Sequence, residues 1–272
     1  KEYFRLKTNN RTMRTEIVVN ERHKDLESEI EQLIQNFHSS GEAIKLARNE
    51  IKNFEINGIN LTVKRFKTIP GIIRFIFAHT SVWSKARRAY ENSMRLLLYG
   101  LHTPCPIAYI NIYSSLTLKD CFYICEYKEL PILDTVFEQP LKKCKKQLKS
   151  FGRYIYNIHN LGVFHGDFST NNVLYEKKDN ETRYYLIDTN RMRFRRYTLR
   201  RGLANFERLV LPVDKMSIIC KEYARQAGAD EIYVFKGILQ SRIRLLRIKK
   251  IKHAYKRFIN IFRKKKTDQN LK

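Results

Sequence analysis

The sequence predicts an α+β fold of two lobes, in which an antiparallel sheet with one important helix precedes a mainly helical half. An Asn-Gly dipeptide at 57–58 joins two strand-like runs, which is the strongest short signal for a β-hairpin. Further strand-like runs end near residue 126, and the clearest apolar helix follows residue 130. With 272 residues, 43% of them hydrophobic, the chain can bury a sizeable core. We expect a sheet lobe over 1–126 and a helical lobe over 127–272.

The charge of the chain narrows the classes of partner. Lys and Arg number 53 against 27 Asp and Glu, which leaves a formal net charge of +26. Self-repulsion on this scale disfavours a compact state unless an anionic partner is near, and nucleic acid, a membrane surface or a phosphorylated substrate would serve. A surface that is only soluble and basic is the alternative.

The cysteines and the hydropathy pattern point to the cytosol. The five cysteines are odd in number and show no CxxC pair or disulfide-framework spacing, so we expect them to be reduced residues of the core. No signal-peptide pattern opens the sequence, and no apolar run approaches the length of a membrane-spanning helix. We therefore expect neither export nor a membrane span.

The sheet lobe begins with two segments of opposite character. Residues 1–20 are polar and basic, so we expect a loose arm there. Over 24–37, apolar residues recur every three or four positions among acidic ones, which indicates an amphipathic helix with one buried stripe. A second helix is predicted over 83–99, because Gly100 follows it as a left-handed cap.

The hairpin at 57–58 gives one lysine a distinct position. On its second strand Ile59, Leu61 and Val63 share one face, which leaves Lys64 on the other. Strands are also predicted at IAYINIY and CFYICEY, and an apolar helix at SFGRYIYNIHNLG. The tail over 236–266 contains thirteen Lys and Arg and no acid, beside an apolar stripe that includes Ile248, Ile251, Tyr255, Phe258 and Phe262; this pattern is typical of a cationic amphipathic helix.

The stretch HGDFSTNNVL contains the clearest chemical motif. Asp167 stands two residues after His165 and five before Asn172, the H-x-D-x-x-x-x-N spacing of the protein-kinase catalytic loop. A carboxylate in such a loop orients an acceptor hydroxyl and takes its proton, while an amide oxygen helps to hold Mg²⁺ on the nucleotide phosphates. We assign the first role to Asp167, with His165 beside it in the catalytic loop, and the second to Asn172.

A second magnesium ligand is predicted downstream. Tyr184 to Ile187 reads as a buried strand that ends at Asp188. Mg²⁺ prefers oxygen ligands, so Asp188 and Asn172, sixteen residues apart across the turn KKDNET, could share one ion.

Three further candidates follow from order and spacing alone. Lys64 would contact nucleotide phosphates, and Glu91, on the next helix, would hold that lysine through an ion pair. Glu126 to Lys128, at the end of a strand just before the helical half, would form a hinge whose backbone contacts adenine. The competing interpretations are a solvated strand lysine at Lys64, a helical pair of Glu91 with Arg87 or Arg95, and coincidence for the motif itself. His159 we expect to be packed in the core, since nothing nearby offers it metal-ligand company.

These segments together resemble the protein-kinase-like superfamily, and more specifically the lipopolysaccharide kinase family of Gram-negative bacteria, which includes Kdo and heptose kinases. The resemblance is found in RNEIKNFEINGINLTVKRFK, SKARRAYENSMRLLLYGLHTPCPIAYI, HGDFSTNNVL and YYLIDTNRMRF, so it covers most of residues 40–200. Its most specific element is IDTNRMRF, where Asn-Arg replaces the Phe-Gly of ordinary protein kinases.

The resemblance implies a two-lobed kinase fold with ATP and Mg²⁺ between the lobes. It also implies transfer of the γ-phosphate to a sugar hydroxyl of Kdo-lipid A or the inner core, on the cytoplasmic face of the inner membrane. By matching position, Asp167 would be the base, Asn172 and Asp188 the Mg²⁺ ligands, and Lys64 the phosphate-binding lysine. One departure concerns the phosphate-covering loop, because FHSSGEAIKLARNE contains Gly41 but no G-x-G-x-x-G.

The charge fits this hypothesis, because each Lys or Arg near an anionic leaflet contributes on the order of 1 kcal/mol of attraction. We expect a monomer that sits at the membrane surface and binds no specific nucleic acid. A disordered basic tail without a lipid role is the alternative for 236–266. The competing functions are a RIO-like protein kinase or aminoglycoside-type small-molecule kinase, and a catalytically inert kinase-like protein that binds nucleic acid.

Overall fold

The computed structural model describes residues 2–10, 13–46, 49–66, 84–114, 117–178 and 181–269. By their internal contacts the residues form two compact units, Lys1–Leu133 with Asn171–Met192, and Asp134–Thr170 with Arg193–Lys272. The lobes expected from the sequence divide the chain once, after Glu126, whereas the contacts place the 171–192 segment with the first unit. None of the helices formed by the described residues is long and apolar enough to cross a membrane.

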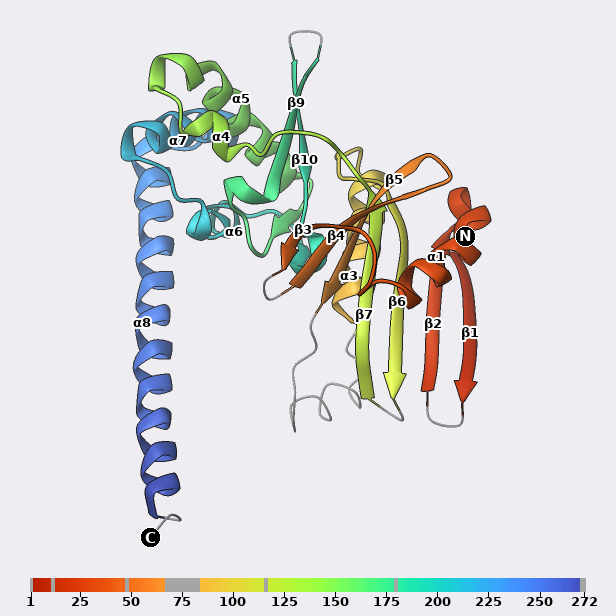
Figure 1. The fold of residues 1–272 in the computed structure, drawn as a ribbon. Coiled ribbons are helices and arrows are strands. Elements are labelled where there is room, and N and C mark those ends of the chain that lie inside the picture. Colours follow the sequence, from red (N-terminus) through yellow and green to blue (C-terminus); the bar gives the residue numbers. More distant parts are fainter. Residues whose placement is uncertain are drawn as a thin grey trace. The chain divides into compact units, whose positions relative to one another are not determined.

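A seven-stranded antiparallel sheet makes up most of the described part of the first unit. Its order is β1-β2-β6-β7-β5-β4-β3 (Figure 1). The strands are β1 Glu2–Asn10, β2 Met13–Asn20, β3 Glu42–Leu46, β4 Asn49–Ile56, β5 Ile59–Phe66, β6 Pro106–Ser114 and β7 Thr117–Glu126. Because β5 pairs with β7, the strand that carries Lys64 lies beside the strand that ends at Glu126.

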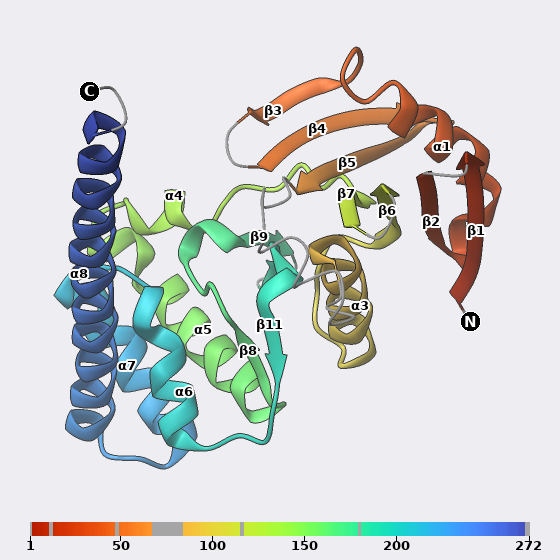
Figure 2. The same ribbon diagram turned by 90° about the horizontal axis from the view of Figure 1, so that it is seen from below.

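Helices cover both faces of this sheet (Figure 2). On one face, η1 (Glu21–Leu26) and α1 (Glu27–Gln35) place Leu26, Ile30 and Phe37 against Leu61 and Val63. This arrangement confirms the amphipathic helix and the strand face predicted from periodicity. On the other face, α3 (Lys85–Leu98) packs its alanines and Tyr90 against the far side of the sheet, where Phe66 of β5 is buried. Lys64 therefore emerges on the α3 side.

The first twenty residues correct one expectation. Residues 2–10 and 13–20 form β1 and β2 instead of a loose arm, and Ile17, Val18 and Val19 of β2 are buried. The physical reason is the short run of β-branched residues, which pairs with β6 and packs on both sides of the sheet. The average hydrophobicity of residues 1–20 is low because charged residues outnumber this short apolar run. For that reason the composition of the segment did not indicate a strand.

The predicted turns are confirmed. Asn57 and Gly58 join β4 to β5 with φ angles of 50° and 76°, the positive values that a two-residue hairpin of this type requires. Gly100 closes α3 with a φ angle of 70°, as a left-handed cap does. The helix thus ends where the sequence indicated.

The first unit also contains a two-stranded hairpin from the second half of the chain. Strand β9 (Val173–Lys178) pairs with β10 (Glu181–Leu186), and Val173 lies opposite Leu186. The short helix η3 (Thr189–Arg191) follows. The middle of the predicted turn KKDNET, residues 179–180, falls outside the described residues.

The second unit is mainly helical, as expected. Its elements are α4 Asp134–Phe137, α5 Leu141–Asn160, β8 Val163–His165, η2 Thr170–Asn172, β11 Met192–Phe194, α6 Leu199–Asn205, η4 Phe206–Arg208, α7 Val213–Ala227 and α8 Glu231–Gln269, with η2 and β11 at its boundaries. Strand β11 pairs with β8. Helices α5 and α7 approach closely at Gly152, where an added Cβ would lie 3.0 Å from the carbonyl oxygen of Ile219.

Helix α8 begins in the core and continues as a basic helix. Val234 and Ile238 are buried, whereas Ile248, Ile251 and Tyr255 of the predicted apolar stripe are exposed. The side chains of Phe258 and Phe262 lie outside the described residues. A helix is thus confirmed, and the lipid role of its stripe stays a prediction.

Candidate functional site

Lys64 and Asp188 form an ion pair inside the first unit. The Lys64 Nζ donates to Asp188 Oδ1 at 2.5 Å, and the two side chains are only 13% and 28% exposed. The residues are 124 positions apart in the sequence, and β5 and the end of β10 bring them together. A partly buried lysine can contact phosphate oxygens, and the carboxylate beside it can bind a metal ion. Binding of a metal-nucleotide requires both charges close together.

The backbone of Asp188 is in the left-handed region, with φ 58° and ψ 45°. For a non-glycine residue this conformation costs about 1–2 kcal/mol, so the surroundings must hold it in place. Such strain clusters at active sites and ligand clamps. We infer that the direction of the Asp188 carboxylate is imposed by its neighbours.

Thr189 is the neighbour that fixes this segment to helix α3. Its hydroxyl donates to the carbonyl oxygen of Ala89 at 3.0 Å and lies 2.9 Å from the Ser93 hydroxyl. The Asn92 side-chain amide donates to the Thr189 carbonyl oxygen at 2.7 Å. Thr189 is buried, so these bonds are protected from water. Thr189 could not be identified from the sequence, because its partners lie about 100 residues earlier.

Asn172 lies next to the Asp188 segment. The backbone N–H of Ile187 donates to the Asn172 carbonyl oxygen at 3.0 Å, one step beyond the Val173–Leu186 register of the hairpin. The two residues predicted to bind magnesium thus flank the same rung, and an amide oxygen and a carboxylate suit a hard cation. The described residues contain no group of three or more His, Cys, Asp or Glu that could hold a metal, so Mg²⁺ would take its other ligands from phosphates and water.

Asp167 belongs to the second unit, in the loop after β8. Its backbone N–H donates to the His165 Nδ1 at 3.1 Å, so the buried His165 ring shapes the loop. Its carboxylate is 28% exposed and pairs with Arg208 Nη1 at 3.0 Å. Phe168, the next residue, is buried and stacks on Phe151. The loop is therefore anchored on both sides of Asp167, while the meeting of Asp167 with Asn172 and Asp188 stays a prediction.

A buried polar chain supports this loop. The Asn205 side-chain amide donates to the His165 carbonyl oxygen at 2.7 Å, and Asn205 Oδ1 accepts from His159 Nε2 at 3.0 Å. The Tyr223 hydroxyl lies 3.0 Å from His159 Nδ1. Burial lowers the pKa of His159 to about 4, against a weaker opposing effect of Asn205, so the ring is neutral at pH 7. His159 is the packed core residue that the sequence predicted.

Glu91 does not pair with Lys64 in this structure. Its carboxylate accepts from Arg87 Nε at 2.7 Å, one turn earlier on the same helix, while Lys64 binds Asp188. The expected Lys64–Glu91 pair is thus replaced by the local i,i+4 pair that the sequence also allowed. A role for Glu91 near the nucleotide stays a prediction.

The hinge candidates lie at the end of β7. The N–H groups of Glu126 and Tyr127 donate to the carbonyl oxygens of Cys105 and Asn60. The Glu126 carboxylate pairs with Lys128 at 2.7 Å. An adenine would therefore have to use other backbone groups of this segment, and the contact itself stays a prediction.

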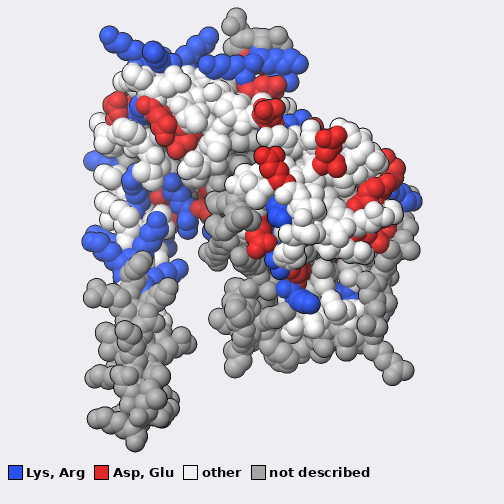
Figure 3. Space-filling view, viewed as in Figure 1, with Lys and Arg blue, Asp and Glu red and all other residues white. Residues whose placement is uncertain are grey.

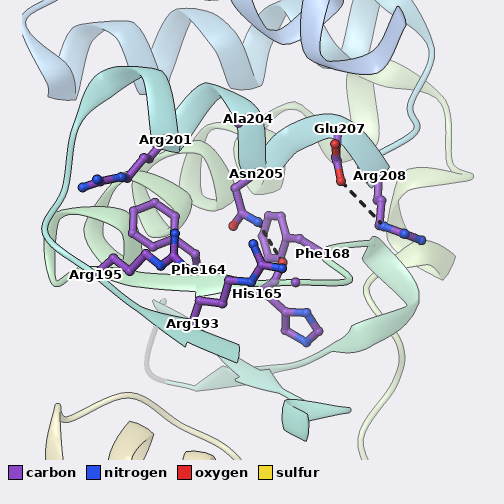
Figure 4. A pocket seen from close by; sticks show the side chains of 11 residues that line it. Phe164, His165, Phe168, Arg193, Arg195, Arg201, Ala204, Asn205, Glu207 and Arg208 are labelled. Atoms are coloured by element: carbon purple, nitrogen blue, oxygen red, sulfur yellow. Dashed lines mark hydrogen bonds and ion pairs between the residues drawn. The ribbon is translucent and has the colours of Figure 1, made fainter. Parts of the chain in front are cut away.

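A cavity of about 230 Å³ lies in the second unit beside the catalytic loop. It is lined by four arginines that the sequence analysis did not single out: Arg193, Arg195, Arg201 and Arg208 (Figure 4). Asn205 and His165 also line it. Arg193 and Arg195 alternate along one strand-like stretch, and this spacing was the available signal.

Basic side chains also gather on the outside of the second unit. Lys142, Lys143, Lys145, Lys146 and Lys149 are exposed on α5. Figure 3 shows Lys and Arg side chains over α5 and along α8. Basic side chains of the second unit thus lie both on the outer faces of α5 and α8 and around the cavity beside the catalytic loop.

Comparisons with known proteins indicate a family and a fold. The model of a family described as "Lipopolysaccharide kinase (Kdo/WaaP) family" matches residues 85–226, more than half of the chain. A solved structure described as "WaaP in complex with acyl carrier protein" is similar with a TM-score of 0.57 and 17% identity, over 84% of this chain and 98% of that one. The Rio2 kinase-ADP/Mg²⁺-phosphoaspartate complex from Chaetomium thermophilum gives a TM-score of 0.45 and 13% identity, over 76% of this chain and 65% of that one. No curated protein sequence matches the chain significantly. The WaaP likeness confirms the protein-kinase-like fold expected from the motifs.

Proposed function

The chain belongs to the lipopolysaccharide kinase (Kdo/WaaP) family, a family of phosphotransferases that act on sugar hydroxyls, and from this we propose that it transfers the γ-phosphate of ATP to a hydroxyl of Kdo or heptose in the lipid A–inner core of lipopolysaccharide. The Lys64–Asp188 ion pair, one hairpin rung from Asn172, is the observation that supports this most. It joins a phosphate-binding cation to two oxygen ligands within one unit.

The residues of the first unit fit a magnesium-nucleotide. Bound Mg²⁺ would neutralise charge on the β- and γ-phosphates. Asp188 and Asn172 would hold it through oxygen atoms, and Lys64 would then contact phosphate oxygens instead of Asp188. The left-handed backbone of Asp188 and the bonds of Thr189 to α3 keep the carboxylate in place before the nucleotide arrives, which reduces reorganisation during transfer.

The second unit supplies the acceptor side. Asp167 would orient the sugar hydroxyl and take its proton as the oxygen attacks the γ-phosphorus. Arg208 pairs with Asp167 and so fixes the carboxylate. A series of hydrogen bonds runs from Tyr223 through His159 and Asn205 to His165. It would hold the backbone of the loop in place.

The outer charge fits a substrate in a membrane. Exposed lysines of α5 and the basic residues of α8 would be attracted to an anionic leaflet by on the order of 1 kcal/mol each. The exposed Ile248, Ile251 and Tyr255 could add burial at the headgroup boundary. We propose that the protein works as a peripheral protein at the cytoplasmic face of the inner membrane.

Phosphotransfer from radiolabelled ATP tests this proposal. The acceptors are Kdo-lipid A, a heptose-containing inner core and a generic protein substrate, each with Mg²⁺ and with excess EDTA. We expect Mg²⁺-dependent label in one glycolipid, reduced at least roughly a hundredfold in both Asp188→Asn and Asp167→Asn. Label in protein with no response to either glycolipid would reject the proposal, and so would RNA binding without any turnover of ATP.

A further inference from the structure

The arginine-lined cavity holds more positive charge than its own residues neutralise. Four arginines and one acid, Glu207, line it. Figure 4 shows Arg201 and Arg208 extending toward opposite ends, with Arg193 between them. Arg193, Arg195 and Arg201 are exposed, so solvent screens part of their repulsion, but like charges gathered around one hollow still repel. The cavity therefore favours an anion.

The arginines differ in how much of their hydrogen-bonding capacity is used. Arg208 pairs with Asp167 through Nη1, but its buried Nε finds no hydrogen-bond acceptor within the described residues; Glu207 Oε1 is 3.9 Å away. Arg201 Nη1 donates to the carbonyl oxygen of Arg196. For the guanidinium groups of Arg193 and Arg195, the described part of the chain provides neither a carboxylate nor a carbonyl partner. N–H donors of these guanidinium groups therefore remain for a ligand.

The backbone below these arginines is firmly placed. The N–H of Arg195 donates to the Gly162 carbonyl oxygen at 2.8 Å. Gly162 has a φ angle of 77°, and an added Cβ there would lie 2.5 Å from the Arg195 carbonyl oxygen. Only glycine allows this approach, so the segment of β11 and Arg195 is held against the end of α5.

We propose that this cavity binds an anionic group of the acceptor, a carboxylate or a phosphate monoester on the sugar that is phosphorylated or on its neighbour. The inference rests on the proposed function and names the acceptor class as an acidic or already phosphorylated sugar. Arginine is the side chain best suited to these anions, because its planar fork donates two parallel bonds.

The position of the cavity explains why an anion there would help the reaction. Arg208 touches both the cavity and the Asp167 carboxylate, so a group held by the arginines places its own sugar ring next to the predicted base. The volume of about 230 Å³ is below the range of pockets that enclose drug-sized ligands. It suits the anionic part of a sugar headgroup.

The test uses the double variant Arg193→Gln/Arg195→Gln in the full-length protein. Arg196→Gln is the matched control, because it removes a charge from an exposed neighbour that does not line the cavity. We measure KM for glycolipid acceptor and for ATP, and the affinity for inorganic phosphate by calorimetry. The double variant should raise the acceptor KM roughly ten- to a hundredfold, since each lost bond to a charged group matters, leave the ATP KM unchanged and lose phosphate binding. The control should match the wild-type protein.

Three results would overturn the inference: an unchanged acceptor KM, a rise confined to the ATP KM, or phosphate binding that persists in the double variant. The last would mark an adventitious ion only. A wild-type protein that phosphorylates no glycolipid but binds phosphate through Arg193 and Arg195 would reject the proposed function while supporting the cavity as an anion site.

Discussion

Lowering the pH should destabilise the second unit through His159. The ring is fully buried between Tyr223 and Asn205, and burial lowers its pKa from 6.5 to about 4. Because the folded pKa is below the unfolded value, the unfolded chain binds a proton that the folded chain refuses. Above pH 6.5 the group has no effect, and stability falls as the pH drops from 6.5 to about 4. The pKa difference corresponds to a loss of about 3 kcal/mol in the free energy of unfolding.

The assay is chemical denaturation, monitored by far-UV circular dichroism, at several pH values between 7 and 4. Other carboxylates and histidines titrate in the same range, so the comparison is with His159→Gln, which keeps an N–H toward Asn205 but does not titrate. The wild-type protein should lose about 3 kcal/mol more than the variant over this window. Parallel stability curves for the two proteins would show that His159 is protonated in the folded state, and the burial argument would be wrong.

Three further outcomes are expected. Asp188→Asn should lower kcat for phosphotransfer by roughly a hundredfold or more, since charge that stabilises the transferring phosphoryl group is lost; activity near the wild-type level would remove Asp188 from the metal site. Thr189→Val should lower kcat roughly tenfold by freeing the Asp188 backbone, while Thr189→Ser, which keeps the hydroxyl bonds, should restore it; equal losses in both would contradict a positioning role. Gly41→Ala should reduce the free energy of unfolding by roughly 2 kcal/mol or more, because Gly41 has a φ angle of 85° and an added Cβ would lie 2.4 Å from the Phe54 ring; Gly100→Ala, with open space around it, should cost clearly less in the same denaturation assay.

The sequence predicted best where neighbouring residues alone decide the geometry. The Asn57-Gly58 turn, the Gly100 cap and the hairpin that brings Asn172 to Asp188 all follow from short spacings. The ion pair of Lys64 with Asp188 was not predicted, because order along the chain does not say which carboxylate a lysine meets. Glu91 pairs with Arg87, one turn away, and not with Lys64, because a local partner needs no particular tertiary arrangement to be in reach.

The acceptor side was harder to predict, because its residues come from separate segments. Arg193 and Arg195 precede α6, whereas Asn205 is the last residue of this helix and Arg208 the last of η4. In the sequence these arginines cannot be told apart from the general excess of basic residues, because a net charge of +26 does not show which cations gather around one cavity.

The physical distinction between these two sets is how their side chains are arranged. Charges on the surface of α5 and α8 act through solvent, where attraction fades beyond about 8 Å at physiological ionic strength. Arg193, Arg195 and Arg201 are exposed too, but they converge on one hollow, where the fixed directions of their N–H groups select the ligand. The outer lysines can therefore hold the protein at any anionic leaflet, while the arginines near Asp167 can discriminate among sugars. Attraction to the membrane and recognition of the acceptor thus depend on different residues of the same basic unit.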